Sequence, residues 1–272
     1  MALLIILVVI LLLSGAVCFM VAPGKRRDTR VFEGKAYAHR GLFDNEGKIP
    51  ENSLAAFRRA RMHGFGVELD VQLTKDGQVV VFHDDTLTRM CGVDGKIGDF
   101  SYHELKRFRL LGTSERIPLF SEVLQELGGM AVICEVKVAQ GADYEALCKA
   151  TAPFIDGYKG DICMESFDPK AVAWFKKNRP DLIRGQLTMN FLKDSGGLPF
   201  IAAFALSNLM LNFIARPDFI AYGDDWGETW GFKLCRSFHP MLAAWTVTSQ
   251  DQQDRLLKKY HSVIFDHYVA QK

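Results

Sequence analysis

The sequence carries almost no net charge, because 33 Lys and Arg residues face 32 Asp and Glu, which leaves +1 at pH 7. Proteins that bind the nucleic-acid backbone need a basic excess, so this balance gives no reason to expect a nucleic-acid partner. No internal repeat or low-complexity segment is visible in the sequence. Without its apolar first two dozen residues, the 272-residue chain has the length of one large α/β barrel domain.

Cysteines are few, and they do not occur in pairs. None of the six lies in a Cys-X-X-Cys pair or has the histidine spacing of a zinc site. Cys134 and Cys163 fall inside apolar, strand-like runs, where a free cysteine behaves as a small hydrophobic residue. The pattern favours a reducing compartment over a disulfide-linked scaffold.

Charge is absent from residues 2–22, ALLIILVVILLLSGAVCFMVA. At about 1.5 Å per residue, a helix of this length spans roughly 30 Å, the thickness of a bilayer's hydrocarbon core. No basic residue precedes the run, as one would in a cleaved signal peptide, and four cations follow it: Lys25, Arg26, Arg27 and Arg30. We therefore expect a single-pass transmembrane anchor at 1–23, a signal peptide being the alternative. By the positive-inside rule the domain after the anchor should be cytoplasmic, at the cell membrane.

Strand-like and helix-like segments alternate after a basic juxtamembrane linker at 24–34. This alternation, in a chain of this size, predicts a parallel α/β barrel over 35–272. The less regular residues 86–118 are expected to form an excursion from it that carries one short helix near 102–108. The eight expected barrel strands are 35–41, 67–73, 130–138, 161–167, 183–188, 218–222, 242–247 and 262–266.

One predicted helix, over 200–215, is apolar nearly all round. The first interpretation is a barrel helix covered by its neighbours. The alternative is a surface that lies against the bilayer to which the anchor ties the domain.

The stretch 67–84, VELDVQLTKDGQVVVFHD, predicts two short strands joined by a tight turn at 75–78. Side chains alternate along a strand, so Glu68 and Asp70 share one face. Carboxylates are costly to bury without a partner, and the second strand runs directly into His83. The stretch fits either a cation site beside a proton-transfer group or a salt-bridged, half-exposed strand.

Further polar residues gather where barrel strands end, the place where such barrels hold their reactive groups. Three carboxylates without cysteine, Glu68, Asp70 and Glu135, form an all-oxygen site that suits Mg²⁺, Ca²⁺ or Mn²⁺. Arg40 and Lys137 would oppose metal binding unless an anion such as phosphate bridged them to the cation. Two histidines, His39 and His83, would supply proton transfer near neutral pH. Each residue alone also has a structural explanation, such as pairing of Lys137 with Glu135.

Five segments resemble the glycerophosphodiester phosphodiesterase family: AHRG at 38–41, PENSLAAF at 50–57, VELDVQLTKDG at 67–77, VVFHD at 80–84 and CEVK at 134–137. Weaker similarities continue to residue 266. The resemblance implies a distorted TIM barrel with a small insertion at 86–118, one divalent metal ion (Mg²⁺ or Ca²⁺), and hydrolysis of glycerophosphodiesters to glycerol 3-phosphate and an alcohol. It also implies an acid–base pair (His39, His83), metal ligands (Glu68, Asp70, Glu135), phosphate contacts (Arg40, Lys137) and a pocket residue (Trp245).

The sequence departs from the family pattern near its C-terminus, at Thr248 and at Phe265-Asp266-His267. These positions bear on the leaving group and not on the reaction.

Two other functions stay open at this point. One is phospholipase D-like hydrolysis of lysophospholipids on the same barrel. The other is a non-catalytic, membrane-tethered binding barrel, whose expected mark is the loss of a histidine or carboxylate, and none of these is missing.

Overall fold

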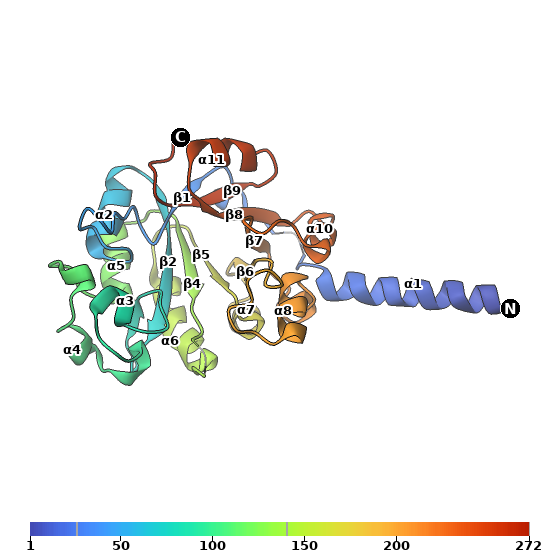
Figure 1. Ribbon diagram of the computed structural model, residues 1–272, viewed down its shortest axis with the longest axis horizontal. Coiled ribbons are helices and arrows are strands. Elements are labelled where there is room, and N and C mark those ends of the chain that lie inside the picture. Colours follow the sequence, from blue (N-terminus) through green and yellow to red (C-terminus); the bar gives the residue numbers. More distant parts are fainter. Residues whose placement is uncertain (26, 140, 272) are drawn as a thin grey trace.

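The computed structural model describes residues 1–25, 27–139 and 141–271, so Arg26 of the predicted linker and the last residue of the predicted barrel lie outside the described residues. Eight parallel strands form a closed barrel with helices between them (Figure 1). The strands neighbour one another in the order β1-β9-β8-β7-β6-β5-β4-β2, and β1 also pairs with β2. The predicted TIM-type barrel is therefore confirmed.

The strands fall where the alternating pattern predicts them. The barrel strands are β1 (Ala36–His39), β2 (Gly66–Leu73), β4 (Val132–Val136), β5 (Ile162–Ser166), β6 (Arg184–Thr188), β7 (Phe219–Gly223), β8 (Met241–Val247) and β9 (Ser262–Phe265). A ninth strand, β3 (Val79–Val81), pairs antiparallel with β2, as the predicted hairpin requires. Gly77 allows the tight turn, because it adopts a φ of 78° and its N–H donates to the Thr74 carbonyl at 3.0 Å.

Five of the described helices of the barrel begin at side chains that accept a backbone N–H. These caps are Ser53, Asp143, Asp168, Thr229 and Ser249. The helices are α2 (Leu54–Met62), α5 (Phe120–Leu127), α6 (Tyr144–Gly157), α7 (Pro169–Asn178), α8 (Phe200–Ser207), α9 (Asn212–Ala215), α10 (Trp230–Arg236) and α11 (Gln250–Leu256).

Strand β2 shows how alternation divides the core. Val67, Leu69 and Val71 are fully buried in the layer between barrel and helices, where they join a cluster that includes Phe57 of α2. The opposite face of β2 carries Glu68 and Asp70 toward the barrel interior. The rest of the barrel interior is filled by a second cluster: Phe32, Tyr37, Ile133, Cys163, Leu187, Phe219, Ala221, Met241, Ala243 and Ile264.

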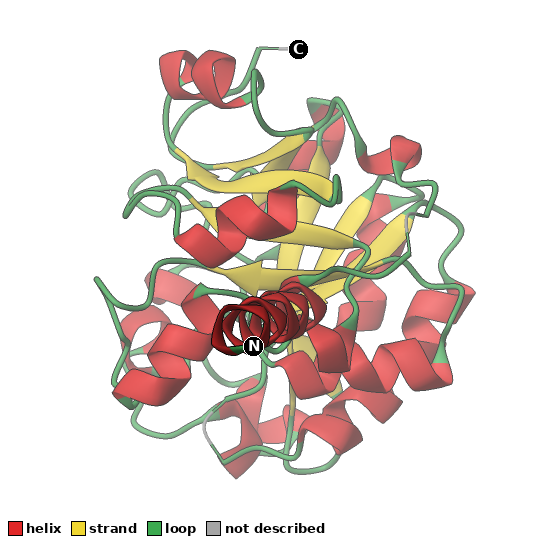
Figure 2. Cartoon of the chain, turned by 90° about the vertical axis from the view of Figure 1, so that its right-hand side faces the viewer, coloured by secondary structure: helices red, strands yellow, loops and turns green. Residues whose placement is uncertain are grey.

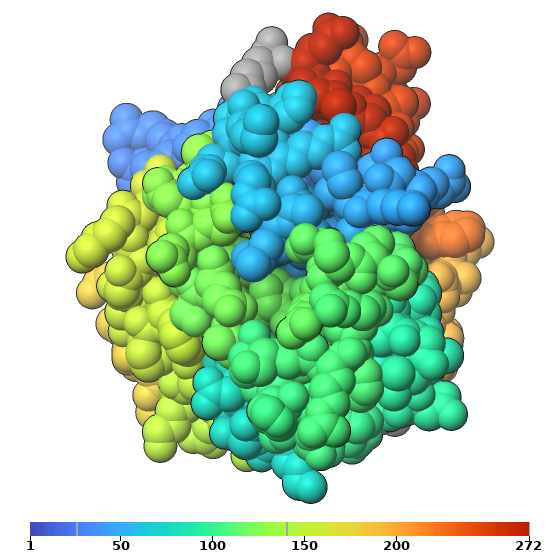
Figure 3. Space-filling model, turned by 90° about the vertical axis from the view of Figure 1, so that its left-hand side faces the viewer, coloured from blue at the N-terminus to red at the C-terminus, as the bar shows by residue number. Residues whose placement is uncertain are grey.

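The insertion after β3 has more structure than the single short helix that the sequence predicts. It contains α3 (Thr88–Cys91), α4 (Tyr102–Leu105) and two 3-10 helices, η2 (Ile97–Asp99) and η3 (Leu110–Gly112). Elements of three or four residues are too short to show a hydrophobic period, which is why the pattern misses them. A small core of their own, with Val80 and Leu105 fully buried, holds them against β3. The insertion (green) and α2 (blue) form much of the face opposite α1 (Figure 3).

The prediction of one helix over 200–215 is wrong, because the chain breaks between α8 and α9. Leu209 adopts a left-handed φ of 55° there. The break lets the buried Asn208 accept the Gly231 N–H at 3.1 Å, a bond that a continuous apolar helix would not supply. The segment is also not covered by its neighbours all round, since Phe200 is 74% and Ile201 81% exposed.

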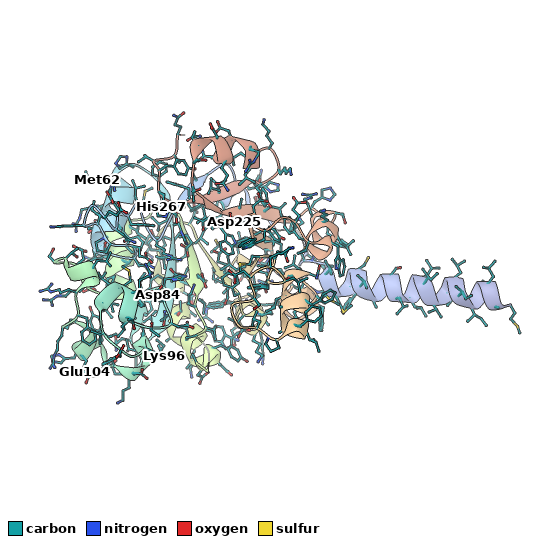
Figure 4. The ribbon with its side chains drawn as sticks, viewed as in Figure 1. Met62, Asp84, Lys96, Glu104, Asp225 and His267 are labelled. Carbon is teal, nitrogen blue, oxygen red and sulfur yellow. The ribbon has the colours of Figure 1, made fainter. Side chains whose placement is uncertain are left out.

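The N-terminal helix α1 (Ala2–Val21) is long and apolar enough to cross a membrane, a property that signal sequences share. It projects away from the barrel as a single rod, with its side chains free along most of its length (Figures 1, 2 and 4). Only its last turns touch the barrel, at α9 and α10, where Val21 is fully buried. A 3-10 helix, η1 (Arg30–Phe32), follows before β1.

Candidate active site

A polar cavity opens at the carboxyl ends of the barrel strands. It is lined by seven of the eight predicted site residues, namely His39, Arg40, Glu68, His83, Glu135, Lys137 and Trp245. Asp70 lies directly beside them, 3.3 Å from the Lys137 ammonium. The residues come from β1, β2, β4, β8 and the segments after β1, β3 and β4, so the closure of the barrel brings them together.

Strand register places the predicted metal ligands side by side. Glu68 is paired with His39 across β1 and β2, and Asp70 with Glu135 across β2 and β4. The three carboxylates are buried, and each offers an oxygen within 4.8 Å of the others. Burial, together with the neighbouring Asp70 and Glu135, raises the pKa of Glu68 well above its usual range. Burial and Asp70 likewise raise the pKa of Glu135 to about 7, although Lys137 opposes this shift.

A fourth buried carboxylate, Glu165 of β5, lies next to Glu135 in register and lines the same cavity. Its Oε2 atom is buried, and no partner for it occurs among the described residues. Burial and the charge of Glu135 raise the pKa of Glu165 well above its usual range. Several crowded carboxylates with an unpartnered oxygen fit a hard divalent cation, whose charge would offset their repulsion. The acidic cluster is thus able to hold a metal ion.

Two cationic side chains, Lys137 and Arg40, lie next to this acidic cluster. The Lys137 ammonium lies 3.3 Å from Asp70 and 3.2 Å from Glu135. Arg40 donates to Glu51 at 2.7 Å, and its buried Nε lies 3.6 Å from Asp70 with no hydrogen bond within the described chain. Although burial opposes it, the charges of Lys137, His83 and Arg40 lower the pKa of Asp70. Both cations therefore have donors directed at the cavity, where they can meet an anionic oxygen.

His39 is held by a residue at the end of β9. Its Nδ1 lies 2.7 Å from Asp266 Oδ2, while Nε2 points to the acidic cluster, 3.9 Å from Glu68. A carboxylate on Nδ1 fixes the tautomer and orientation of the ring and leaves Nε2 for proton transfer. Burial, with Arg40 close by, lowers the pKa of His39 even though Asp266 opposes the shift.

His83 has a carboxylate partner of its own in the next residue. Its Nδ1 lies 2.8 Å from Asp84 Oδ1, on the side of the molecule that carries the insertion (Figure 4). Arg89 of α3 donates to both Asp84 oxygens at 2.7 Å, and to the two Glu51 oxygens at 2.7 and 2.8 Å. Glu51 also accepts from Arg40, so one ion-pair network joins Arg89 of the insertion to Arg40 and, through Asp84, to His83.

Several of these positioning residues were not predicted as site residues. Asp84 and Glu51 stand inside the quoted motifs and Glu165 in the stretch of weaker similarity, but no feature of the sequence gives them a separate role. Asp266 was noted only as a departure from the family pattern. The available indication was topological: β9 neighbours β1 in a closed barrel, so the end of β9 must lie beside His39.

Aromatic side chains form the wall on the far side of the cavity. Trp245 of β8 packs edge-on against Phe167 at 5.5 Å between ring centroids, and Phe167 in turn contacts Phe191. The Lys137 ammonium lies 6.0 Å from the Phe167 ring. The Trp245 indole nitrogen is buried and has no acceptor in the described part of the chain. The cavity thus has an ionic floor and a partly apolar rim.

A closed barrel with reactive groups at the carboxyl ends of its strands defines the class, a (β/α)8-barrel enzyme. The glycerophosphoryl diester phosphodiesterase family model matches residues 39–270. The chain therefore belongs to this family.

Known proteins agree with this assignment. A glycerophosphodiester phosphodiesterase of Caldanaerobacter subterraneus subsp. tengcongensis is 30% identical over 234 residues, which cover 81% of this chain and 88% of the relative. In fold, the chain is similar to an Oleispira antarctica phosphodiesterase solved with its product sn-glycerol-3-phosphate (TM-score 0.70, 24% identity, 87% and 94% of the two chains). It is also similar to a Thermotoga maritima glycerophosphodiester phosphodiesterase (TM-score 0.64, 26% identity, 85% and 93%). The predicted family is thus confirmed.

Proposed function

We propose that this protein hydrolyses glycerophosphodiesters to glycerol 3-phosphate and an alcohol, with His39 and His83 as the acid–base pair. The observation that carries the proposal is the pairing of each histidine Nδ1 with a carboxylate, at 2.7 Å for His39 and 2.8 Å for His83. Both rings line one cavity together with Arg40 and Lys137. Family membership gives the reaction, and this geometry supports the proposed roles of the two histidines, Arg40 and Lys137.

The chemistry needs two proton transfers. One histidine accepts the proton of the attacking hydroxyl, whose oxygen forms the new P–O bond, and the other donates a proton to the oxygen of the P–O bond that breaks. The attacking hydroxyl belongs to water, which gives glycerol 3-phosphate directly, or to the neighbouring glycerol, which gives a cyclic phosphate that water opens in a second step. Arg40 and Lys137 hold the phosphate oxygens and stabilise the charge that develops on them.

The acidic cluster supplies the site for one divalent ion, which we take to be Mg²⁺ or Ca²⁺. Glu68, Asp70 and Glu135 would hold it, with Glu165 as a neighbouring carboxylate. When bound, the ion adds positive charge beside the phosphate and lowers the cost of the extra negative charge in the transition state. Lys137 and Arg40, which lie beside these carboxylates, are the cations that would contact the phosphate of a substrate bound there.

A second substrate class is favoured by the apolar surface on segments that follow β6 and β7. Phe200, Trp226 and Trp230 are 74%, 50% and 45% exposed, and the Trp230 ring lies 6.4 Å from that of Phe204. Because these segments leave the strands at their carboxyl ends, the apolar surface borders the side on which the cavity opens. Lysophospholipids, which carry one acyl chain, are therefore the alternative substrate for the same phospholipase D-like cleavage.

The test is a parallel assay of glycerophosphocholine, glycerophosphoethanolamine and lysophosphatidylcholine with the metal-stripped protein. We expect no turnover after chelation and recovery when Mg²⁺ or Ca²⁺ is returned. Release of glycerol 3-phosphate from the first two substrates supports the main proposal, and preference for the third supports the alternative. No turnover of any of them with either ion would leave the non-catalytic barrel as the better interpretation.

The proposed location of the protein in the cell follows from the apolar helix α1. It acts as a single uncleaved membrane span over 1–23, with a basic linker over 24–34 and the barrel over 35–272, insertion 86–118 included, in the cytoplasm. The four basic residues that closely follow α1 support this orientation. The exposed apolar side chains Phe213 (38%) and Ile214 (41%) next to the end of α1 support a barrel surface that faces the bilayer.

A further inference from the structure

A second cavity lies at the opposite end of the barrel strands from the active site. It is bounded by the segment that leaves α1, by α7, and by the starts of β6 and β7, and we call it the cationic cavity. Its lining residues are Pro23, Gly24, Lys25, Arg27, Lys176, Arg184, Arg216 and Asp218. Five of these eight described residues are basic and one is acidic, whereas the chain as a whole is nearly neutral.

The contacts between α1 and the barrel fix this cavity in place. The Gly24 N–H donates to the Pro217 carbonyl at 2.8 Å, and a side chain at position 24 would collide with the Arg216 carbonyl. Arg216 donates to the Phe19 and Ala22 carbonyls at 3.1 and 2.8 Å. The end of α1 is thereby bound to the barrel, and the cations beside it have defined positions.

The positive charge of the cavity is only partly compensated. Asp218 is shared between Arg27 at 3.2 Å and Arg184 at 3.5 Å. The Arg184 side chain is only 7% exposed, and its Nε has no hydrogen-bond partner among the described residues. Partial burial, and next the charges of Arg216 and Arg184, lower the pKa of Lys176, as expected where like charges lie close enough to repel one another. An anion entering the cavity would relieve that repulsion.

The place of the cavity relative to α1 indicates where the anion comes from. Pro23 and Gly24 line the cavity, and they directly follow the last apolar residues of α1. When α1 spans a bilayer, this level is the head-group layer, where lipid phosphates lie. The partly exposed Phe213 and Ile214 lie on α9, which contacts the same end of α1 and can meet the acyl region of the leaflet.

We propose that the cationic cavity binds the phosphate of an anionic phospholipid in the leaflet from which α1 emerges. This site is separate from the active site, and it rests on the proposed membrane span. Basic pockets beside transmembrane helices suit such head groups, because several Lys and Arg side chains can contact one phosphate. A bound lipid would then fix the barrel against the membrane at a second point besides α1.

The test uses the full chain in nanodiscs of phosphatidylcholine and phosphatidylglycerol at a 4:1 ratio, with EDTA present so that no lipid is hydrolysed. Native mass spectrometry after release into detergent counts the lipids that stay bound. We expect phosphatidylglycerol to be retained in preference to phosphatidylcholine. Lys25→Glu and Lys176→Glu should each reduce that retention about fivefold or more. Lys177→Glu, the same charge change at the next, exposed position of α7, should leave retention unchanged.

Equal retention of phosphatidylglycerol in the Lys176→Glu, Lys25→Glu and Lys177→Glu proteins would overturn the proposal. So would complete displacement of the lipid by millimolar inorganic phosphate, which would assign the cavity to a soluble phosphate. Melting temperatures without lipid check that each variant is folded. Incorporation of the chain into nanodiscs is scored separately, so failure of the membrane span is distinguished from failure of the lipid site.

Discussion

At both histidines a carboxylate fixes one ring nitrogen, and the other nitrogen remains for proton transfer. We expect His39→Ala and His83→Ala each to lower kcat by about two to four orders of magnitude, because each removes one proton transfer. The fold should be retained, since both residues stand at strand ends. His103→Ala, at an exposed position of the insertion, is the control. Turnover close to that of the native protein in either variant would remove that histidine from the mechanism.

Asp266 acts through His39 and is therefore a positioning residue. Asp266→Asn keeps the size of the side chain but loses the charge that faces His39 Nδ1 at 2.7 Å. We expect kcat to fall about 10- to 100-fold with little change in KM, because substrate contacts are untouched while the imidazole loses its fixed orientation. Asp225→Asn, an exposed acid on the loop after β7 (Figure 4), is the matched control. A change confined to KM would show that Asp266 contacts substrate instead.

Among the elements, α3 joins the insertion to the active site through one arginine. Burial alone would raise the pKa of Glu51, but hydrogen bonds from Arg89 and the charge of Arg40 outweigh it and lower this pKa to about 2. The folded-state pKa is thus below that of the unfolded chain. Ionised Glu51 stabilises the fold fully above about pH 5, and this stabilisation is lost as the pH falls from there toward 2.

A shift of this size corresponds to about 3 kcal/mol of unfolding free energy. Urea unfolding at several pH values between 6 and 3 measures it. We expect Glu51→Gln to be less stable than the native protein at pH 6 and to lose less stability on acidification. Glu46→Gln, an exposed acid on the preceding loop, should keep the native pH slope. If both variants show the same slope, the Glu51 network does not carry this pH dependence.

Elements whose pattern is local could be predicted from the sequence, whereas features that depend on distant contacts could not. Strands such as β2 were predicted because Val67, Leu69 and Val71 alternate with polar residues, and this pattern is local. The break between α8 and α9 was missed because the local pattern does not mark it, and the bond found there, from Gly231 to Asn208, joins two different helices. The histidines and the three predicted carboxylates of the site could be identified because they lie in sequence motifs. Asp266 and Glu165 depend on which strands become neighbours, so their place in the site could not be read from a single segment.

For the whole molecule, the near-zero net charge conceals a separation of charge between the two ends of the barrel. Four carboxylates gather at the carboxyl ends of the strands, whereas five cations line the cavity at the amino ends of β6 and β7. With the proposed divalent ion bound beside Arg40 and Lys137, the acidic end would attract a phosphate-bearing substrate more strongly than without it. Metal loading should therefore control substrate affinity as well as turnover.

The orientation of the whole chain is the last prediction. Residues 2–22 carry no charge and four cations follow them closely, and by the positive-inside rule such a basic flank stays on the cytoplasmic side. Protease added to intact cells or spheroplasts should therefore leave the barrel uncut, and detergent should expose it. N-terminal sequencing of the mature protein should find α1 still attached. Cleavage from outside, or a mature chain that begins after residue 22, would contradict the cytoplasmic anchor. The catalytic proposal would stand in either case, because it depends on different residues.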